Sequence, residues 1–125
     1  MYLQGQYEVQ LLDSWSKTEV KAGDNGGIYE RWDESKPDGQ KGYQGYAPRM
    51  NASKAPGIWQ TLNVKFKAPR FSPSGEKIEN ARIVSATLNG VMIHEDVELF
   101  GPTRGAMSGG EVALGPIRIQ GDHGP

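Results

Sequence analysis

The first residues able to do chemistry lie in the segment "YEVQLLD" near the start of the chain. Glu8 and Gln10 alternate with the apolar residues Tyr7, Val9 and Leu11, which is the two-residue period of a β-strand with one apolar face. The carboxylate and the carboxamide therefore share the opposite face, roughly 7 Å apart. Two interpretations stay open: the pair lines a groove, with Glu8 as a general base, or it faces water as the polar side of an antiparallel strand.

Two histidines offer a side chain whose pKa lies near neutrality. His123 follows Asp122 in "QGDHGP", a loop that can hold an imidazole at the edge of a sheet for proton transfer. His94 lies on an expected strand, where a histidine is more often a surface or hydrogen-bonded residue than a catalyst. His123 is therefore the candidate for catalysis, with Asp122 to orient it, and His94 is at most a substrate contact.

A glycine-rich stretch between residues 14 and 57 shows no sustained hydrophobic period and is interpreted as loops, with one short strand in "GGIYE". Loops of this length in a compact domain are often functional. Its aromatic rings offer flat apolar faces that stack on sugar rings, or they simply anchor the loops. Trp32 and Tyr29 are the candidate sugar contacts among its five aromatic residues, which are Trp15, Tyr29, Trp32, Tyr43 and Tyr46.

The motifs of several familiar enzyme classes are absent from the chain. It has no phosphate-binding loop, no His-Glu-x-x-His motif, no dinucleotide fingerprint and no nucleophile elbow. Position 10 is a glutamine where a jelly-roll glucanase needs a second carboxylate on the strand. A two-carboxylate glycosidase would require Glu8 to find a partner elsewhere, such as Asp13, Glu95 or Glu98.

Composition limits the partners and the fold class. Fourteen basic residues nearly balance fifteen acidic ones in 125 residues, so neither nucleic acid nor an anionic membrane is an expected partner. No segment is apolar enough to span a bilayer, and "MYLQGQYEV" is no signal peptide. The absence of cysteine leaves the compartment open. Seventeen glycines and eight prolines predict many short strands, and hence an all-β domain.

The clearest strands lie in the second half of the chain. Alternation predicts a strand at 62–68, and Asn89-Gly90 predicts a β-hairpin, because both turn residues must take positive φ. "FSPSGEKIEN" is interpreted as a turn, and "IRIQ" as a last short strand. This order of strands predicts an antiparallel sandwich or jelly roll. The count of five or six strands falls short of the roughly eight that a jelly roll uses.

Long segments of the chain resemble the 3-keto-disaccharide hydrolase domain family. The most specific are "YEVQLLDS", "NASKAPGIWQTLNVKFKAPRF" and "QGDHGP", and the resemblance runs through residues 1–125. It implies one concanavalin-like jelly roll from an exported bacterial protein, periplasmic or extracellular. Family domains generally have strands before "YLQG" and a final strand after "DHGP". Their lack here leads us to expect an incomplete sandwich and a homo-oligomer formed through exposed sheet edges.

The resemblance also implies cleavage of glycosides whose sugar carries a 3-ketone. A base removes the acidified hydrogen at C2, the group at C1 departs, and water can add to the enone. On this hypothesis Glu8 or His123 is the base, with Asp13 or Asp122 to orient the histidine. No cofactor is required, and a divalent metal at His123 is left open. The candidate substrate contacts are Gln10, Asn51, Gln120, His94, Trp32 and Tyr29.

Two other functions remain open at this point. The same jelly roll could hold an oligosaccharide with its aromatic loops and catalyse nothing, so enzymatic activity is undecided. Alternatively, exposed strand edges could make the chain a self-assembling structural fragment.

Overall fold

The computed structural model describes residues 1–121 as an all-β chain. Asp122 and His123 therefore lie outside the described residues. The part described holds no helix, and so none that could cross a membrane. Its pairings are antiparallel, which confirms the predicted fold class. The strands are β1 (Tyr2–Leu3), β2 (Tyr7–Glu8), β3 (Arg31–Trp32), β4 (Gly42–Tyr43), β5 (Leu62–Lys67), β6 (Arg70–Phe71), β7 (Lys77–Glu79), β8 (Ala81–Leu88) and β9 (Val91–Leu99).

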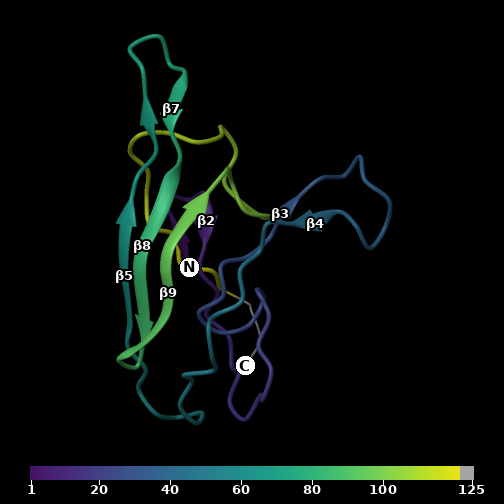
Figure 1. Cartoon of the computed structure of the whole chain (residues 1–125), viewed down its shortest axis with the longest axis vertical. Helices are drawn as coiled ribbons and strands as arrows, with labels where there is room; N and C mark the ends of the chain where they lie inside the picture. The colour runs from purple at the N-terminus through teal and green to yellow at the C-terminus, as the bar shows by residue number, and fades with distance from the viewer. Residues whose placement is uncertain (122–125) are drawn as a thin grey trace.

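The first layer is a three-stranded sheet in the order β5-β8-β9 (Figure 1). Strand β5 covers the predicted 62–68 segment, and its side chains alternate between half-buried and exposed as expected. Strands β8 and β9 form the predicted hairpin, with φ of 53° at Asn89 and 83° at Gly90. The Asn89 side chain also fastens the turn to the residues before β5, since its Oδ1 accepts from the Thr61 N–H at 2.9 Å.

The second layer is built from short strands that single bridges join together. β1 pairs with β2, and β3 pairs with β4. Bridges at Val9–Ile28 and Ile28–Tyr46 connect these two pairs, and Arg118 pairs with Tyr2 on the other side of β1. The segments "GGIYE" and "IRIQ", each predicted as a strand, thus contribute one bridging residue apiece. Figure 1 shows the β3–β4 hairpin projecting from the body of the molecule.

A hydrophobic core joins the two layers into a β-sandwich. Tyr7 and Val9 are almost fully buried and belong to one cluster with Ile83 and Ile93 of the three-stranded sheet. The Tyr7 ring lies 5.6 Å from the ring of Phe66 on β5. Each such side chain contributes roughly 1.5–3 kcal/mol on burial. Because side chains alternate, the residues between them in sequence face away from this core.

One sequence-based expectation differs from the structure, and another is confirmed with added detail. Leu11 is 41% exposed, so its predicted place on the apolar face is wrong. Gln10 exchanges backbone hydrogen bonds with Gly26 and Gly27, but Leu11 lies outside the regular strand β2, so its side chain need not keep the alternation. The turn predicted in "FSPSGEKIEN" is present, but it lies within a short hairpin of β6 and β7.

The turn between β8 and β9 allows a test of the fold. Replacing Gly90 with Ala adds a Cβ at a φ of 83° but removes no side-chain contact. We expect the free energy of unfolding to fall by about 1 kcal/mol, as for an alanine forced into positive φ. Urea denaturation would measure it. An unchanged midpoint would contradict the positive-φ turn, and Asn89→Gly would report separately on the side-chain hydrogen bonds.

Candidate functional site

Glu8 lies at the centre of a row of residues that crosses the second layer. Glu8 is in register with Tyr2 on β1, and the Tyr29 N–H donates to the Glu8 carbonyl oxygen at 3.0 Å. Arg118 extends the row through its bridge to Tyr2. Cross-strand neighbours share a face, and alternation turns this face away from the hydrophobic core. Four short segments of distant sequence therefore bring these side chains together.

The polar side chains on this face are buried. Glu8 and Gln10 are each 2% exposed, so the interpretation that they simply face water is wrong. The backbone around Glu8 is closely packed, since its N–H donates to the Thr103 hydroxyl at 3.0 Å. The same hydroxyl donates to the carbonyl oxygen of Gln6. The segment after β9 thus runs directly beside β2.

Several oxygen atoms on this face are hydrogen-bond acceptors with no partner among the residues that the structure describes. They include the Oε1 atoms of Gln6, Glu8 and Gln10. The Gln6 amide is oriented by its Nε2, which donates to the Met107 carbonyl at 3.2 Å. An unsatisfied buried acceptor costs about 1–3 kcal/mol, so native proteins keep few of them without a reason. A ligand with several hydroxyl donors would satisfy this set.

Tyr2 places a protonated hydroxyl beside the Glu8 carboxylate. Burial raises the pKa of Tyr2 to about 12, and hydrogen bonding to Glu8 adds to the rise. The Arg118 guanidinium lies 4.0 Å from the centre of the Tyr2 ring and acts in the opposite direction. The Tyr2 hydroxyl donates to the Arg104 carbonyl at 3.2 Å. The single phenolic proton is thus directed to the Arg104 carbonyl in this structure, with the Glu8 side chain beside the hydroxyl.

Two further arginines lie against aromatic rings of the β3–β4 hairpin. The Arg31 guanidinium is 5.1 Å from the Tyr43 ring and packs so closely on Gly101 that a Cβ there would come within 2.6 Å of it. The Nε of Arg31 is buried without a partner in the described residues. Arg104 lies 3.8 Å from the Trp32 ring. One face of Trp32, a predicted sugar contact, is therefore covered by a cation.

Within the described part of the chain, the hydrogen bonds of the other predicted residues do not include Glu8. Asp13 is exposed and accepts from the Trp15 N–H at 2.9 Å. Asn51 donates to the Ser14 carbonyl at 2.6 Å, so its amide holds a loop. Gln120 is exposed. His94 is buried and its Nε2 lies 2.8 Å from the Gly26 carbonyl. Their proposed roles, and those of Asp122 and His123, stay predictions.

No cluster of three side chains of the metal-ligating types occurs within residues 1–121. Four of the residues described above were not predicted from the sequence: Gln6, Tyr2, Arg31 and Arg118. Gln6 shares the parity of Glu8 and Gln10, so alternation could have found it. Tyr2, Arg31 and Arg118 depend on pairings between distant segments, which a single sequence does not reveal.

Comparison with known proteins gives one match. The model of a family described as 3-keto-alpha-glucoside-1,2-lyase-like domains matches residues 1–125, the whole chain. No curated protein and no solved structure matches. The family's description concerns a carbohydrate substrate, in agreement with the acceptor-rich face around Glu8.

The buried His94 predicts a pH-dependent stability. Burial holds the pKa of His94 below its ordinary value of 6.5, and the nearby Arg49 adds to this. The unfolded chain therefore binds a proton more readily, so the free energy of unfolding should fall as the pH drops below 6.5. Urea denaturation between about pH 7 and pH 5, where most carboxylates stay ionised, would measure the slope.

The matched variant is His94→Gln, whose amide can donate to the Gly26 carbonyl but does not titrate. Its slope in this pH range should be smaller than that of the wild type. Equal slopes would show that His94 does not contribute to the acid sensitivity.

Proposed function

We propose that this chain, which belongs to the family of 3-keto-alpha-glucoside-1,2-lyase-like domains, cleaves a 3-keto-glycoside by eliminating the group at C1. Membership supports a carbohydrate-active role, and the local chemistry supports the type of reaction. The observation that carries the proposal is the buried Glu8 carboxylate. One of its oxygens is unpaired in the described structure, and it lies beside the protonated hydroxyl of Tyr2.

The reaction that fits these groups is an elimination through an enolate. The ketone at C3 acidifies the hydrogen at C2, and a carboxylate removes that proton. The electron pair of the C–H bond then becomes the C2–C3 double bond, with the negative charge on the C3 oxygen. When the carbonyl re-forms, C1 and C2 become doubly bonded and the C1–O bond breaks. The departing oxygen takes a proton, so that the products are an enone and an alcohol.

Glu8 is the proposed base because it is the carboxylate at the centre of the row. Tyr2 is the proposed donor of a hydrogen bond to the developing negative charge, since its raised pKa keeps the phenol protonated. The Arg118 guanidinium, 4.0 Å from the centre of the Tyr2 ring, would add to this stabilisation. Gln6 and Gln10 would accept hydrogen bonds from the hydroxyls of the sugar through their unpaired Oε1 atoms.

A sugar reaches the Glu8 carboxylate only if a neighbouring segment moves, because Glu8 is 2% exposed. We assign this movement to residues 101–117, which lie between β9 and the Arg118 bridge and contain no regular strand. Few backbone hydrogen bonds tie this segment to the β1–β2 turn, among them Thr103 N–H to Gln6 and Met107 N–H to Gly5. Glu111 adds a side-chain tie, since its carboxylate accepts from the Tyr7 hydroxyl at 2.5 Å and pairs with Lys77 at 2.7 Å.

The test is an NMR time course with a 3-keto-disaccharide beside the unoxidised disaccharide. We expect the wild type to release the aglycone sugar from the keto form alone. Glu8→Gln keeps the shape of the side chain but removes the base, so turnover should fall about 10²–10⁴-fold. Glu76→Gln, in the exposed turn between β6 and β7, is the matched control and should leave turnover unchanged.

Two outcomes would contradict the proposal in different ways. Full turnover by Glu8→Gln would remove Glu8 from the chemistry while leaving the activity intact. If the wild type bound the sugars, as judged from broadened ligand signals, but cleaved neither, the chain would be a carbohydrate-binding domain.

A further inference from the structure

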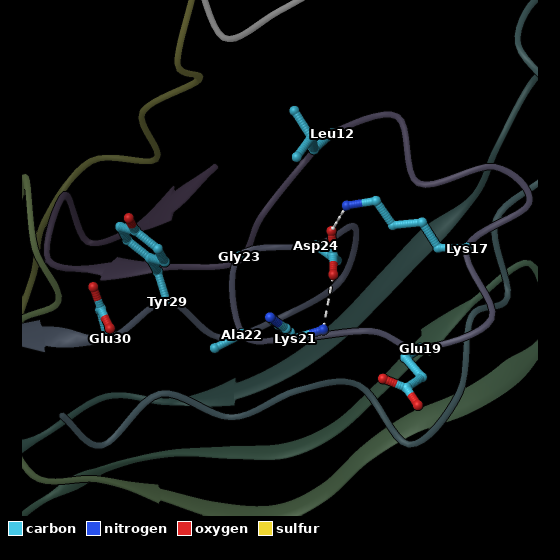
Figure 2. Close-up of a pocket in the computed structure, with 9 residues that line it drawn as sticks. All are labelled: Leu12, Lys17, Glu19, Lys21, Ala22, Gly23, Asp24, Tyr29 and Glu30. Atoms are coloured by element: carbon cyan, nitrogen blue, oxygen red, sulfur yellow. Dashed lines mark hydrogen bonds and ion pairs between the residues drawn. The ribbon is translucent and has the colours of Figure 1, made fainter. Parts of the chain in front are cut away.

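A pocket of about 660 Å³ lies beside Tyr29, near the acceptor-rich face around Glu8. This volume lies within the range of roughly 300–1,000 Å³ that is typical of small-molecule sites. Figure 2 shows the Tyr29 ring on one side of the space and the Lys17–Asp24 ion pair on the other, with Gly23 between them. The lining residues are Leu12, Lys17, Glu19, Lys21, Ala22, Gly23, Asp24, Tyr29 and Glu30.

The pocket lies next to the Glu8 row because Tyr29 belongs to both. Its backbone N–H donates to the Glu8 carbonyl at 3.0 Å, while its side chain lines the pocket. Residues opposite each other on paired strands have Cβ atoms roughly 5 Å apart. Leu12, two residues after Gln10 in the chain, also lines the pocket. A ligand whose reacting carbon lies at Glu8 would therefore reach the pocket with its next ring.

The lining of the pocket fits a neutral, polyhydroxylated ligand. The Tyr29 ring offers an apolar face for a pyranose. Ammonium groups of Lys17 and Lys21 and carboxylates of Glu19 and Glu30 offer donors and acceptors. Asp24 is already satisfied, because it accepts from Lys17 Nζ at 2.5 Å and from the Lys21 N–H at 2.8 Å. With both signs of charge present, nothing in the lining selects a strongly charged ligand.

We infer that this pocket is the subsite for the leaving sugar, a neutral pyranose that departs from C1 of the oxidised ring. The inference rests on the proposed function, since it takes the reacting bond to lie at Glu8. A subsite at this place predicts a substrate preference. A disaccharide should react better than a glycoside with a small aglycone, because only the disaccharide fills the pocket beside Tyr29. Binding energy from a remote part of a substrate of this kind raises kcat/KM.

A substitution at Gly23 would fill the pocket while leaving Glu8 and Tyr29 unchanged in the sequence. A Cβ added at Gly23 would lie 3.7 Å from Cε2 of Tyr29, an ordinary contact distance. Gly23→Ala should therefore be tolerated, whereas the larger side chain of Gly23→Leu should cover the Tyr29 ring. These two variants form a matched pair that differs only in how far the side chain extends.

The experiment compares two substrates of the same oxidised sugar, a 3-keto-disaccharide and a methyl 3-keto-glucoside. For Gly23→Leu we expect kcat/KM to fall about tenfold for the disaccharide, the loss of one modest binding contact, and to stay within about twofold for the methyl glycoside. Gly23→Ala, with the shorter side chain, should lose less of the kcat/KM for the disaccharide than Gly23→Leu, and Glu76→Gln in the exposed β6–β7 turn should match the wild type on both substrates. An equal loss on both substrates, or no loss on either, would overturn the subsite.

A binding measurement distinguishes a wrong subsite from a wrong proposed function. If the wild type cleaves neither substrate, glucose is titrated and its NMR line widths are followed. Broadening by the wild type and by Gly23→Ala, but not by Gly23→Leu, would support a sugar site in the pocket. Absence of broadening with the wild type would overturn it.

Discussion

The strict alternation of side chains along residues 7–10 is the constraint on which the rest of this structure depends. Tyr7 and Val9 must enter the core for the two layers to pack, because they are among its most deeply buried members. Glu8 and Gln10 are thereby forced to the opposite face. That face is itself enclosed, so the same four residues supply both the apolar contact between the layers and a buried polar row. The candidate site is a direct consequence of how the core is built.

Such a buried polar row lowers the free energy of unfolding. Several unpaired acceptors in buried positions cost roughly 1–3 kcal/mol each. The apolar cluster on the other side of the same strand offsets this cost, since each large side chain buried there contributes a comparable amount. A polar row of this kind is therefore retained at the expense of stability, which is typical of residues that serve a ligand.

The parts of the fold that a single sequence could predict are those with local signals. β5 follows its alternation, and the β8–β9 hairpin follows Asn89 and Gly90, whose positive φ angles the turn requires. The second layer was predicted only in fragments, because its strands are two residues long and pair across large distances in sequence. Leu11 shows the same limit, since alternation in the sequence does not reveal where a regular strand ends.

The candidate site was likewise predictable only in part. Glu8 and Gln10 could be found from their spacing, and Tyr29 from its aromatic type. The close packing around Glu8 could not, because the Thr103 hydroxyl that accepts from its N–H lies almost a hundred residues further along the chain. Tyr2 and Arg118 come together through a bridge between the two ends of the described chain. Residue type and spacing alone carry no information on such a contact.

Tyr29 gives its backbone to the Glu8 strand and its ring to the neighbouring pocket. The two places are consequently held next to each other by the backbone of one residue and one backbone hydrogen bond. Tyr29 therefore keeps the pocket beside the Glu8 strand. On the proposed subsite, changes in the size or charge of loop residues 12–24 would alter the lining of the pocket without moving it away from the Glu8 strand.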